Sequence, residues 1–332
     1  MKFIKISEDS NLPKYQQIIN SVEKSIANQL LKKNDKLPSI NKICLEFSVS
    51  RDTVLYAYEE LKKKGLVYAI LGKGYFVKSI DWDFQERIFL LFDELNAFKE
   101  NLYNSFMEAI SNKAKVDVFF HFFNIEVFRK LIEDNNGNYT KYIIMPSNIN
   151  GTTPLIKLLP KKEVFILDQS NPELKDYASI FQNFAKDMFN GLKKAKSNLE
   201  LYNRLILIFP GKKEPIGMVE GFLDFCEKYK LNHNIISDFT NDEIKIGDVF
   251  VIIDDRHLVN VILQSKKQKF KIKRDFGIIS YNETPLKSVV ENGITTISTD
   301  FSLMGKTLAE MIFSANHSRI ENPSDLIMRN SL

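Results

Sequence analysis

Residues 87–332 alternate short apolar runs with stretches of helical periodicity, and this alternation limits the possible folds more than any other feature of the chain. The runs include FLLF, YIIM, FIL, LILIF, FVII and GIIS. Near-continuous apolar runs of this kind indicate strands buried on both faces, as in parallel sheets covered by helices. The strand–helix alternation occurs twice, so the pattern predicts two doubly wound α/β lobes.

The pattern also places the individual elements of this part of the chain. Strands are expected at residues 87–93, 116–123, 142–147, 163–169, 204–210, 234–239, 249–255 and 276–282. Helices are expected at residues 96–112, through Ile132, and at 154–159, 177–196, 216–229, 257–267, 286–291 and 302–316. Ligands of such sheets bind beyond the carboxyl ends of the strands, in the crevice between lobes.

Residues 14–77 have a different pattern, which predicts three helices followed by a hairpin. Apolar residues recur at helical spacing over 14–31, and Ser39 and Ser50 stand where the N-caps of two further helices are expected. Gly65 is placed to end the third helix. The β-prone runs LVYAI and GYFVKS then flank the turn sequence LGKG. Together these elements predict a winged helix-turn-helix.

Charge is distributed unevenly along the chain. The net charge is +4, whereas residues 1–80 hold 14 Lys and Arg against 8 Asp and Glu, which gives +6 for this segment and −2 for the rest. A basic head joined to a near-neutral body is typical of a polyanion-binding module attached to a unit with another task. The alternative is a set of lysine-rich helices that are merely solvated.

The start of the third predicted helix carries the residues suited to read DNA. A recognition helix presents small polar and cationic side chains at its N-terminal end. Ser50, Arg51 and Thr53 stand there, and Arg51 can contact a guanine or a phosphate through two hydrogen bonds. Lys73 lies between two glycines at the predicted wing tip, which is slim enough to enter a minor groove. The plainer interpretation is a capped surface helix with one arginine.

This segment resembles the winged-helix domain of GntR-family transcriptional regulators over about 65 residues. The similarity lies in PKYQQI, LPS, VSRDTV, YEEL, GLV and GKGYFV, in that order. It implies contacts to operator DNA from Ser39, Ser50, Arg51, Thr53, Gly72 and Lys73. Asn41 and Leu55 occupy positions where some members carry DNA-contacting arginines, so Asn41 joins the predicted contact set while the base preference does not transfer.

The body resembles the two-lobed, periplasmic-binding-protein-like sensor domain of LacI-type regulators. The similar stretches are residues 89–93, 96–98, 251–255, 275–285 and 295–300, with Met304 and Gly305. The combination implies a cytoplasmic, DNA-binding repressor of a carbohydrate-utilisation operon that acts as a homodimer on double-stranded DNA and senses a monosaccharide or related small polar metabolite. The Glu-Pro-Ile-Gly-Met stretch at 214–218 replaces an arginine that sugar-responsive relatives often carry there.

Polar residues just after the predicted strands are the candidate ligand contacts. The set comprises Asp93, Asn96, Ser147, Asp168, Asp254, Arg256 and Asn282, with Phe98 as an aromatic platform for a sugar ring. Each polar residue could equally cap the helix that follows it. Arg256 is the single cation that the sequence places at this rim, so neutral sugars are favoured over sugar phosphates.

The predicted domains are residues 1–79 and 87–332, joined by a linker at 80–86 that contains Trp82. The first residues lack the apolar run of a signal peptide, and no stretch is long and apolar enough to span a bilayer. The two cysteines, Cys44 and Cys226, form no C-x-x-C pair. These features favour a reducing cytoplasm and no membrane partner.

The sequence lacks the motifs that would indicate an enzyme. No two of the four histidines stand at i, i+3 or i, i+4, and the sequence contains no G-x-S-x-G motif. We therefore expect no enzyme activity, no metal site and no cofactor. The remaining alternative to a sugar sensor is an orphan DNA-binding regulator whose body serves dimerisation or protein contacts.

Overall fold

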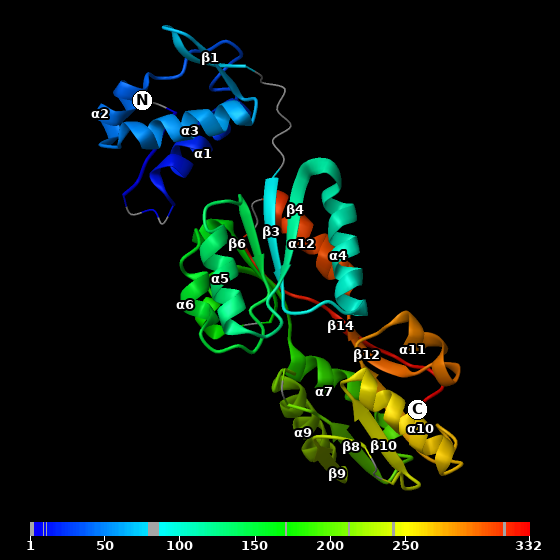
Figure 1. Ribbon diagram of the computed structural model, residues 1–332. Helices are drawn as coiled ribbons and strands as arrows, with labels where there is room; N and C mark the ends of the chain where they lie inside the picture. Colours follow the sequence, from blue (N-terminus) through cyan, green and yellow to red (C-terminus); the bar gives the residue numbers. More distant parts are fainter. Residues whose placement is uncertain are drawn as a thin grey trace.

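The computed structural model describes residues 3–8, 10, 12–78, 86–169, 171–211, 213–240, 243–314 and 317–332. Within these ranges the chain forms a small N-terminal head, residues 12–78, and a body of two α/β lobes (Figure 1). Trp82 and residues 80–85 of the predicted linker lie outside the described residues, and Glu86 begins the first strand of the body. Among the described helices, none combines the length and the apolar character needed to cross a membrane.

The head has the predicted three helices and hairpin. They are α1 (Lys14–Ala27), α2 (Ile40–Phe47), α3 (Arg51–Lys63), β1 (Val67–Ile70) and β2 (Gly74–Val77). Ser39 caps α2 by accepting a hydrogen bond from the Lys42 N–H at 3.3 Å, and Ser50 caps α3 by accepting from the Thr53 N–H at 3.1 Å. The apolar faces of these elements form one core that includes Ile18, Val22, Ile43, Val54, Tyr58 and Leu61.

The first helix is shorter than its periodicity predicts. Residues 14–31 keep apolar side chains at helical spacing, but α1 ends at Ala27. Gln29 adopts a left-handed conformation with φ 56°, and the Leu30 N–H donates back to the Ser25 carbonyl at 2.8 Å. This hydrogen-bonded turn closes the helix, leaving Leu30 66% exposed while Leu31 packs into the core.

The N-lobe is built on a six-stranded parallel sheet of order β13-β7-β6-β5-β3-β4. Its strands are β3 (Glu86–Phe92), β4 (Ala114–Phe120), β5 (Lys141–Ile144), β6 (Val164–Gln169), β7 (Ala178–Gln182) and β13 (Arg319–Glu321). Its helices are α4 (Ala97–Ile110), α5 (Ile125–Asn135), α6 (Thr152–Ile156) and α12 (Phe301–Phe313). One apolar cluster under α4 and α12 and another under α5 and α6 cover the two faces of this sheet.

The C-lobe sheet has the order β14-β12-β11-β10-β8-β9, with β14 antiparallel to β12. Its strands are β8 (Arg204–Ile208), β9 (His233–Ile236), β10 (Asp248–Ile252), β11 (Gly277–Tyr281), β12 (Thr295–Thr299) and β14 (Ser324–Ile327). Its helices are α7 (Phe184–Lys194), α8 (Lys196–Leu199), α9 (Gly217–Tyr229), α10 (Asp255–Lys267) and α11 (Pro285–Val289). Two apolar clusters again cover the two faces.

Both sheets reverse their strand order at one place, and this determines where a ligand can bind. The reversal lies between β3 and β5 in the N-lobe and between β8 and β10 in the C-lobe. In doubly wound sheets the loops at such a reversal leave a crevice beyond the carboxyl ends of the strands. Asp93 follows β3 and Asp254 follows β10, so both residues lie at these crevices.

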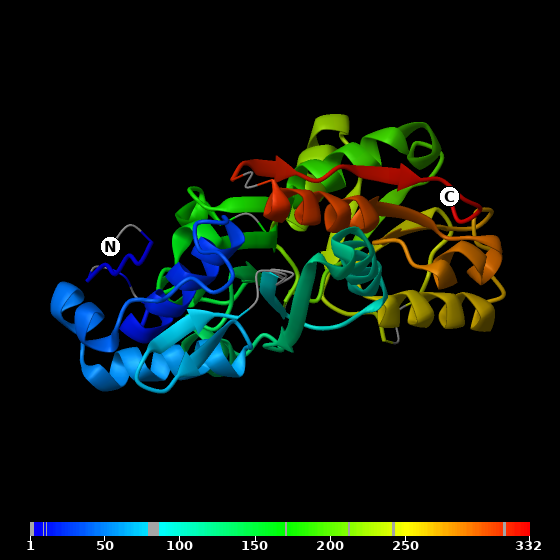
Figure 2. The ribbon, with the colours of Figure 1, turned by 90° about the horizontal axis from the view of Figure 1, so that it is seen from above.

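The chain crosses between the lobes three times, after β7, after β12 and between β13 and β14 (Figures 1 and 2). Asn322, 1% exposed, ties two of the crossings together, because its side-chain amide donates to the Thr299 hydroxyl at 2.8 Å and to the Asp300 carbonyl at 2.9 Å. After the second crossing α12 packs against α4. A Cβ at Gly305 would lie 2.4 Å from the Leu102 carbonyl, so glycine is what permits this close approach.

Several strands of the body were not expected from the sequence. Residues 178–182 form β7, whereas the periodicity assigned 177–196 to one helix; the helical part begins at Phe184. The strands β12, β13 and β14 were also not predicted. The predicted fold class, a winged helix with a two-lobed doubly wound body, is confirmed.

Candidate functional site

The exposed face of the head carries the residues predicted to contact DNA. Ser39, Asn41, Ser50, Arg51, Gly72 and Lys73 are exposed, and Thr53 is half-buried. The Arg51 guanidinium donates to the Asn41 side-chain carbonyl at 3.0 Å, which links the starts of α3 and α2. Gly72 and Gly74 have φ of 74° and 104°, and these positive values are what the tight wing turn around Lys73 requires.

A cleft cavity of about 260 Å³ lies between the two lobes of the body. It is lined by Asp93, Glu94, Asn96, Phe98, Lys99, Phe123, Asp168, Gln169, Gln182, Phe184, Lys213, Glu214, Pro215, Met218, Ile253, Asp254, Asp255, Arg256, Tyr281 and Asn282. Both lobes contribute charged, amide and aromatic side chains. A ligand in this cavity would therefore contact polar groups of both lobes.

Several residues at the strand ends near this cleft have a left-handed backbone conformation. Phe122, Phe123, Ser147, Asp168 and Asn282 all have φ between 49° and 76°, which is uncommon for residues with a side chain. They follow or end strands β4, β5, β6 and β11. Strained backbone of this kind persists where the surrounding structure holds it, and it is enriched at functional sites.

Most charges in the cleft are paired before any ligand arrives. Lys99 forms a buried ion pair with Asp93, whose other oxygen accepts from the Ser147 hydroxyl at 2.8 Å. Ser147 thus holds Asp93 and is not among the residues that line the cavity. Across the cleft, the Lys213 ammonium from the C-lobe lies 2.7 and 2.8 Å from the two carboxylate oxygens of Glu94 in the N-lobe.

Two predicted ligand residues also cap helices, as the plainer interpretation expected. Asn96 accepts from the Lys99 N–H at 3.2 Å to cap α4, and Asp254 accepts from the Arg256 N–H at 2.7 Å to cap α10. The hydrogen bond from the Arg256 side chain also holds the pKa of Asp254 below its usual range. Capping and lining are compatible here, because both helices begin at the cleft.

Deeper in the cleft, several buried polar groups have no hydrogen-bond partner. The Gln182 amide N–H donates to Asp168 at 2.5 Å, so its carbonyl oxygen faces elsewhere and is unpaired among the described residues. The Tyr281 hydroxyl and the Asn282 side-chain carbonyl are likewise unpaired. Gln182 is 4% exposed and Tyr281 1%. Unpaired buried polar groups are costly, so these atoms are candidates for contact with a ligand.

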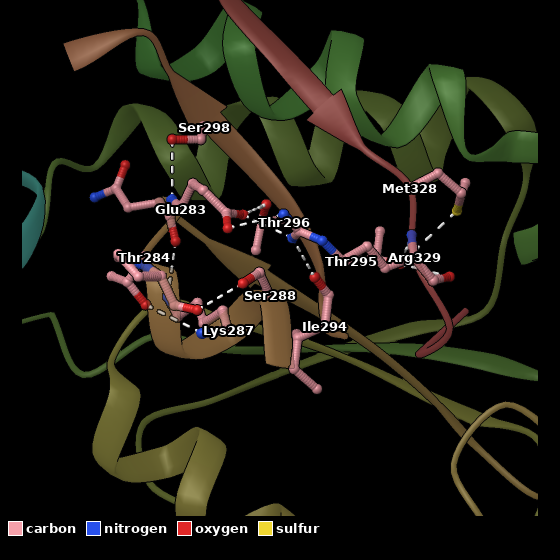
Figure 3. A network of polar contacts seen from close by, with 12 residues as sticks. Glu283, Thr284, Lys287, Ser288, Ile294, Thr295, Thr296, Ser298, Met328 and Arg329 are labelled. Carbon is pink, nitrogen blue, oxygen red and sulfur yellow. Dashed lines mark hydrogen bonds and ion pairs between the residues drawn. The ribbon is translucent and has the colours of Figure 1, made fainter. Parts of the chain in front are cut away.

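Lys287 fixes the loop that carries Tyr281 and Asn282. Its ammonium donates to the main-chain carbonyls of both residues at 2.8 Å and forms an ion pair with Asp255 at 2.8 Å. Burial lowers the pKa of this lysine. Figure 3 shows the neighbouring network, in which Arg329 from the C-terminal segment donates to both carboxylate oxygens of Glu283 at 2.8 and 2.9 Å.

Seven of the eight predicted ligand residues line the cleft, and several further polar residues that line it were not predicted from the sequence. Lys99, Lys213, Gln182 and Tyr281 were not predicted. The expectation that Arg256 is the single cation at the rim is wrong, because Lys99 and Lys213 line the same cavity. Lys99 stands in the first turn of a helix, where a lysine usually faces solvent, and Gln182 was hidden in a segment interpreted as helix.

Comparison with known proteins assigns a family to the N-terminal head. Residues 14–77 match the family described as bacterial regulatory proteins, gntR family. The chain carries a GntR-family DNA-binding domain. The chain is also 37% identical over 70 residues to the arabinose metabolism transcriptional repressor of Geobacillus stearothermophilus, a stretch that covers 21% of this chain and 19% of that protein. Across eight curated bacterial regulators, the aligned stretch spans 15–57% of the relative's length.

Solved structures show the fold of the body that follows this GntR-family head. The trehalose repressor from Escherichia coli has a TM-score of 0.61 at 13% identity, with 73% of this chain and 100% of that chain covered. A LacI-type regulator from Alkaliphilus metalliredigens, solved with D-xylulofuranose, has a TM-score of 0.59 at 18% identity, with 74% and 99% covered. At these identities the likeness establishes a LacI-type, periplasmic-binding-protein-like fold.

Proposed function

We propose that this protein is a ligand-responsive transcriptional repressor in which a small polar metabolite, bound between the lobes, changes the affinity of the head for operator DNA. The observation that supports this most is the cleft, where buried, unpaired oxygen atoms from both lobes line one cavity. A ligand bonded to both lobes stabilises the lobe arrangement that it fits, and it acts on DNA binding only through that preference.

On the DNA side, we propose contacts from Ser39, Asn41, Ser50, Arg51 and Thr53 on the helices and from Gly72 and Lys73 at the wing. Arg51 is exposed and projects from the start of α3, where a recognition helix meets base edges. Its hydrogen bond to Asn41 orients the guanidinium before DNA arrives. Because one winged helix reads few base pairs, the regulator acts as a homodimer on a near-palindromic site.

The effector is a neutral or cationic polyol rather than a phosphorylated one. Asp93, Asp168, Asp254 and Asn282 supply acceptors, and the names of the relatives include repressors of arabinose and trehalose systems. Among the described lining residues the cations are Lys99, Lys213 and Arg256, and each already forms an ion pair with a carboxylate. A phosphate would have to displace those carboxylates.

Head and body are proposed to be separable units, residues 1–79 and 84–332. Each has its own apolar core, since the cluster in the head shares no residue with the four clusters in the body. The transition between them falls in residues 79–85. This division places the DNA contacts and the effector contacts in different folding units, so one can be altered without the other.

Thermal unfolding of the full chain with a panel of monosaccharides and hexose phosphates tests the effector class. We expect at least one unphosphorylated sugar to raise the Tm at millimolar concentration, because a ligand that binds only the folded state stabilises it. Asn282→Ala should abolish this increase, since Asn282 lines the cleft, has an unpaired side-chain carbonyl and caps no helix. Leu201→Ala, at a site 82% exposed, is the matched control. If no sugar raises the Tm, the orphan-regulator alternative is favoured.

A further inference from the structure

One carboxylate of the cleft stands apart from the others because of how it is paired. The lining contains the carboxylates of Asp93, Glu94, Asp168, Glu214, Asp254 and Asp255 against the cations Lys99, Lys213 and Arg256. Asp93, Glu94 and Asp254 pair with those three cations, and Asp255 pairs with Lys287. Asp168, which is 6% exposed, forms no ion pair with any described residue.

Two oxygen atoms without a hydrogen-bond partner belong to residues that line the cleft with Asp168. Its hydrogen bond from the Gln182 amide directs the Gln182 carbonyl oxygen away from the carboxylate, and that oxygen has no donor among the described residues. The Tyr281 hydroxyl, also unpaired, is held on the opposite lobe by the loop that Lys287 fastens. All three groups line the same cavity. Lys99, whose positive charge lowers the pKa of Asp168, is already engaged in its ion pair with Asp93. Among the described residues, this part of the cleft therefore has no cation left to pair with Asp168.

We propose that the effector carries a protonated amine beside its hydroxyl groups, as an amino sugar does, and that Asp168, Gln182 and Tyr281 receive this ammonium group. An ammonium has three N–H donors and one positive charge, and these meet two acceptors that have no donor and one carboxylate that has no cation. A neutral polyol would satisfy the acceptors but would leave the buried carboxylate to share Lys99 with Asp93, without a cation of its own, which is costly. The inference rests on the function proposed above and names the chemical class of its effector.

The ionisation of Asp168 supplies a second readout. Burial raises the pKa of this carboxyl in the empty cleft, the positive charge of Lys99 lowers it, and the negative charge of Asp93 raises it. A bound ammonium favours the ionised form, and binding then releases a proton. The measured heat of binding will therefore depend on the ionisation enthalpy of the buffer. A neutral sugar at the same site gives no such dependence.

Isothermal titration calorimetry on the full chain tests the proposal with matched pairs: D-glucosamine and D-glucose, D-galactosamine and D-galactose, D-mannosamine and D-mannose. We expect at least one amino sugar to bind tenfold or more tightly than its parent, with proton release. Asp168→Asn keeps the shape of the side chain and should abolish the preference, leaving the parent sugar's affinity within about twofold. Asp224→Asn, which removes a charge from the exposed face of α9, should keep the preference.

The calorimetry can contradict the amino-sugar inference and the sugar-sensing function separately. Binding of a neutral parent sugar as tightly as its amino form in every pair overturns the inference and leaves the sugar-sensing function standing. A preference that survives in Asp168→Asn also overturns the inference. Should Asp168→Asn fail to fold, Gln182→Met serves as the second variant, with the same loss of preference expected. If no sugar of any pair binds, the sensing function itself fails.

Discussion

At the residue scale, the starts of α3 and of the wing determine how the head would recognise DNA. Arg51 is exposed, donates to Asn41 and contributes nothing to the apolar core of the head. Ser50 is committed to capping α3, because its hydroxyl accepts from the Thr53 N–H and lies 2.7 Å from the Thr53 hydroxyl. The Arg51 side chain instead forms an exposed hydrogen bond to Asn41, so it is the residue best placed to contact DNA without a cost to the fold.

Arg51→Ala should therefore weaken operator binding without weakening the fold. Loss of a bidentate base or phosphate contact costs about 1–3 kcal/mol, and substitution of an exposed side chain changes stability by less than about 0.5 kcal/mol. Fluorescence anisotropy with a labelled duplex and thermal unfolding measure the two effects. Arg129→Ala, on an exposed face of α5 in the body, is the control. A parallel loss of Tm and DNA affinity would show that Arg51 is structural.

The residues of the cleft illustrate what a sequence can reveal about a site. Asp93, Asp254 and Asn282 could be predicted because they follow apolar strands whose carboxyl ends meet at one edge. Lys99 could not, since nothing in a helical first turn indicates that a lysine will be buried against an aspartate. The ion pair between Lys213 and Glu94 could not be predicted either, because it joins two lobes through residues far apart in the chain.

At the scale of elements, α7 follows directly on the first crossing between the lobes and carries a buried acid. Asp187 in its first turn is 7% exposed, and its carboxylate oxygen Oδ2 has no hydrogen-bond partner among the described residues. Burial, reinforced by the negative charge of Glu321, raises the pKa of Asp187 to about 7 from its ordinary 3.8. The folded state therefore holds a proton that the unfolded chain loses at lower pH.

This difference predicts how stability changes with pH. The contribution of Asp187 is fully present below pH 3.8 and is lost as the pH rises through about 7, because the unfolded state binds fewer protons in that window. Asp187→Asn should remove the dependence and raise the free energy of unfolding at pH 8 by up to about 4 kcal/mol. Urea unfolding from pH 5 to 8.5 checks this, with Asp224→Asn as control. Identical profiles for Asp187→Asn and wild type would contradict it.

Elements with long, regular patterns were predictable, whereas short strands at the hinge were not. The helices α4, α9, α10 and α12 were placed within a few residues, because each buries a stripe at helical spacing. Residues 178–182 were assigned to a helix, yet they form β7 because β6 and β13 pair with them on either side. Gln182 was missed for the same reason.

At the scale of the whole molecule, the C-lobe presents an apolar face suited to a second copy of the chain. Val259 and Leu263 on α10 are 53% and 52% exposed, and Leu286 and Val289 on α11 are 68% and 69% exposed. The two helices are adjacent, since Lys287 pairs with Asp255. Exposed apolar side chains gathered on linked helices are a candidate for an interaction site. The proposed two-fold operator requires a second copy, which makes the same chain the expected partner.

If this face is the interface of the proposed dimer, Leu263→Glu should give a monomer and reduce operator affinity at least tenfold, because the charge would be buried unpaired at the contact. Analytical ultracentrifugation measures the mass, and anisotropy measures the affinity. Leu201→Glu places the same charge at another exposed leucine and should leave both unchanged. A Leu263→Glu variant that remains dimeric would place the interface elsewhere.

Ligand occupancy of the cleft is proposed to control DNA binding by the head, and this is measured as release of DNA on addition of the ligand. A labelled duplex chosen by in vitro selection on the full chain is bound at low salt, and the sugar that gives the largest rise in Tm is titrated into the complex. We expect the anisotropy to fall as the wild type releases DNA, with a midpoint near the Kd for the sugar, while Asn282→Ala stays bound throughout. If the wild type binds the sugar in its cleft and keeps an unchanged Kd for the duplex, the claim is contradicted.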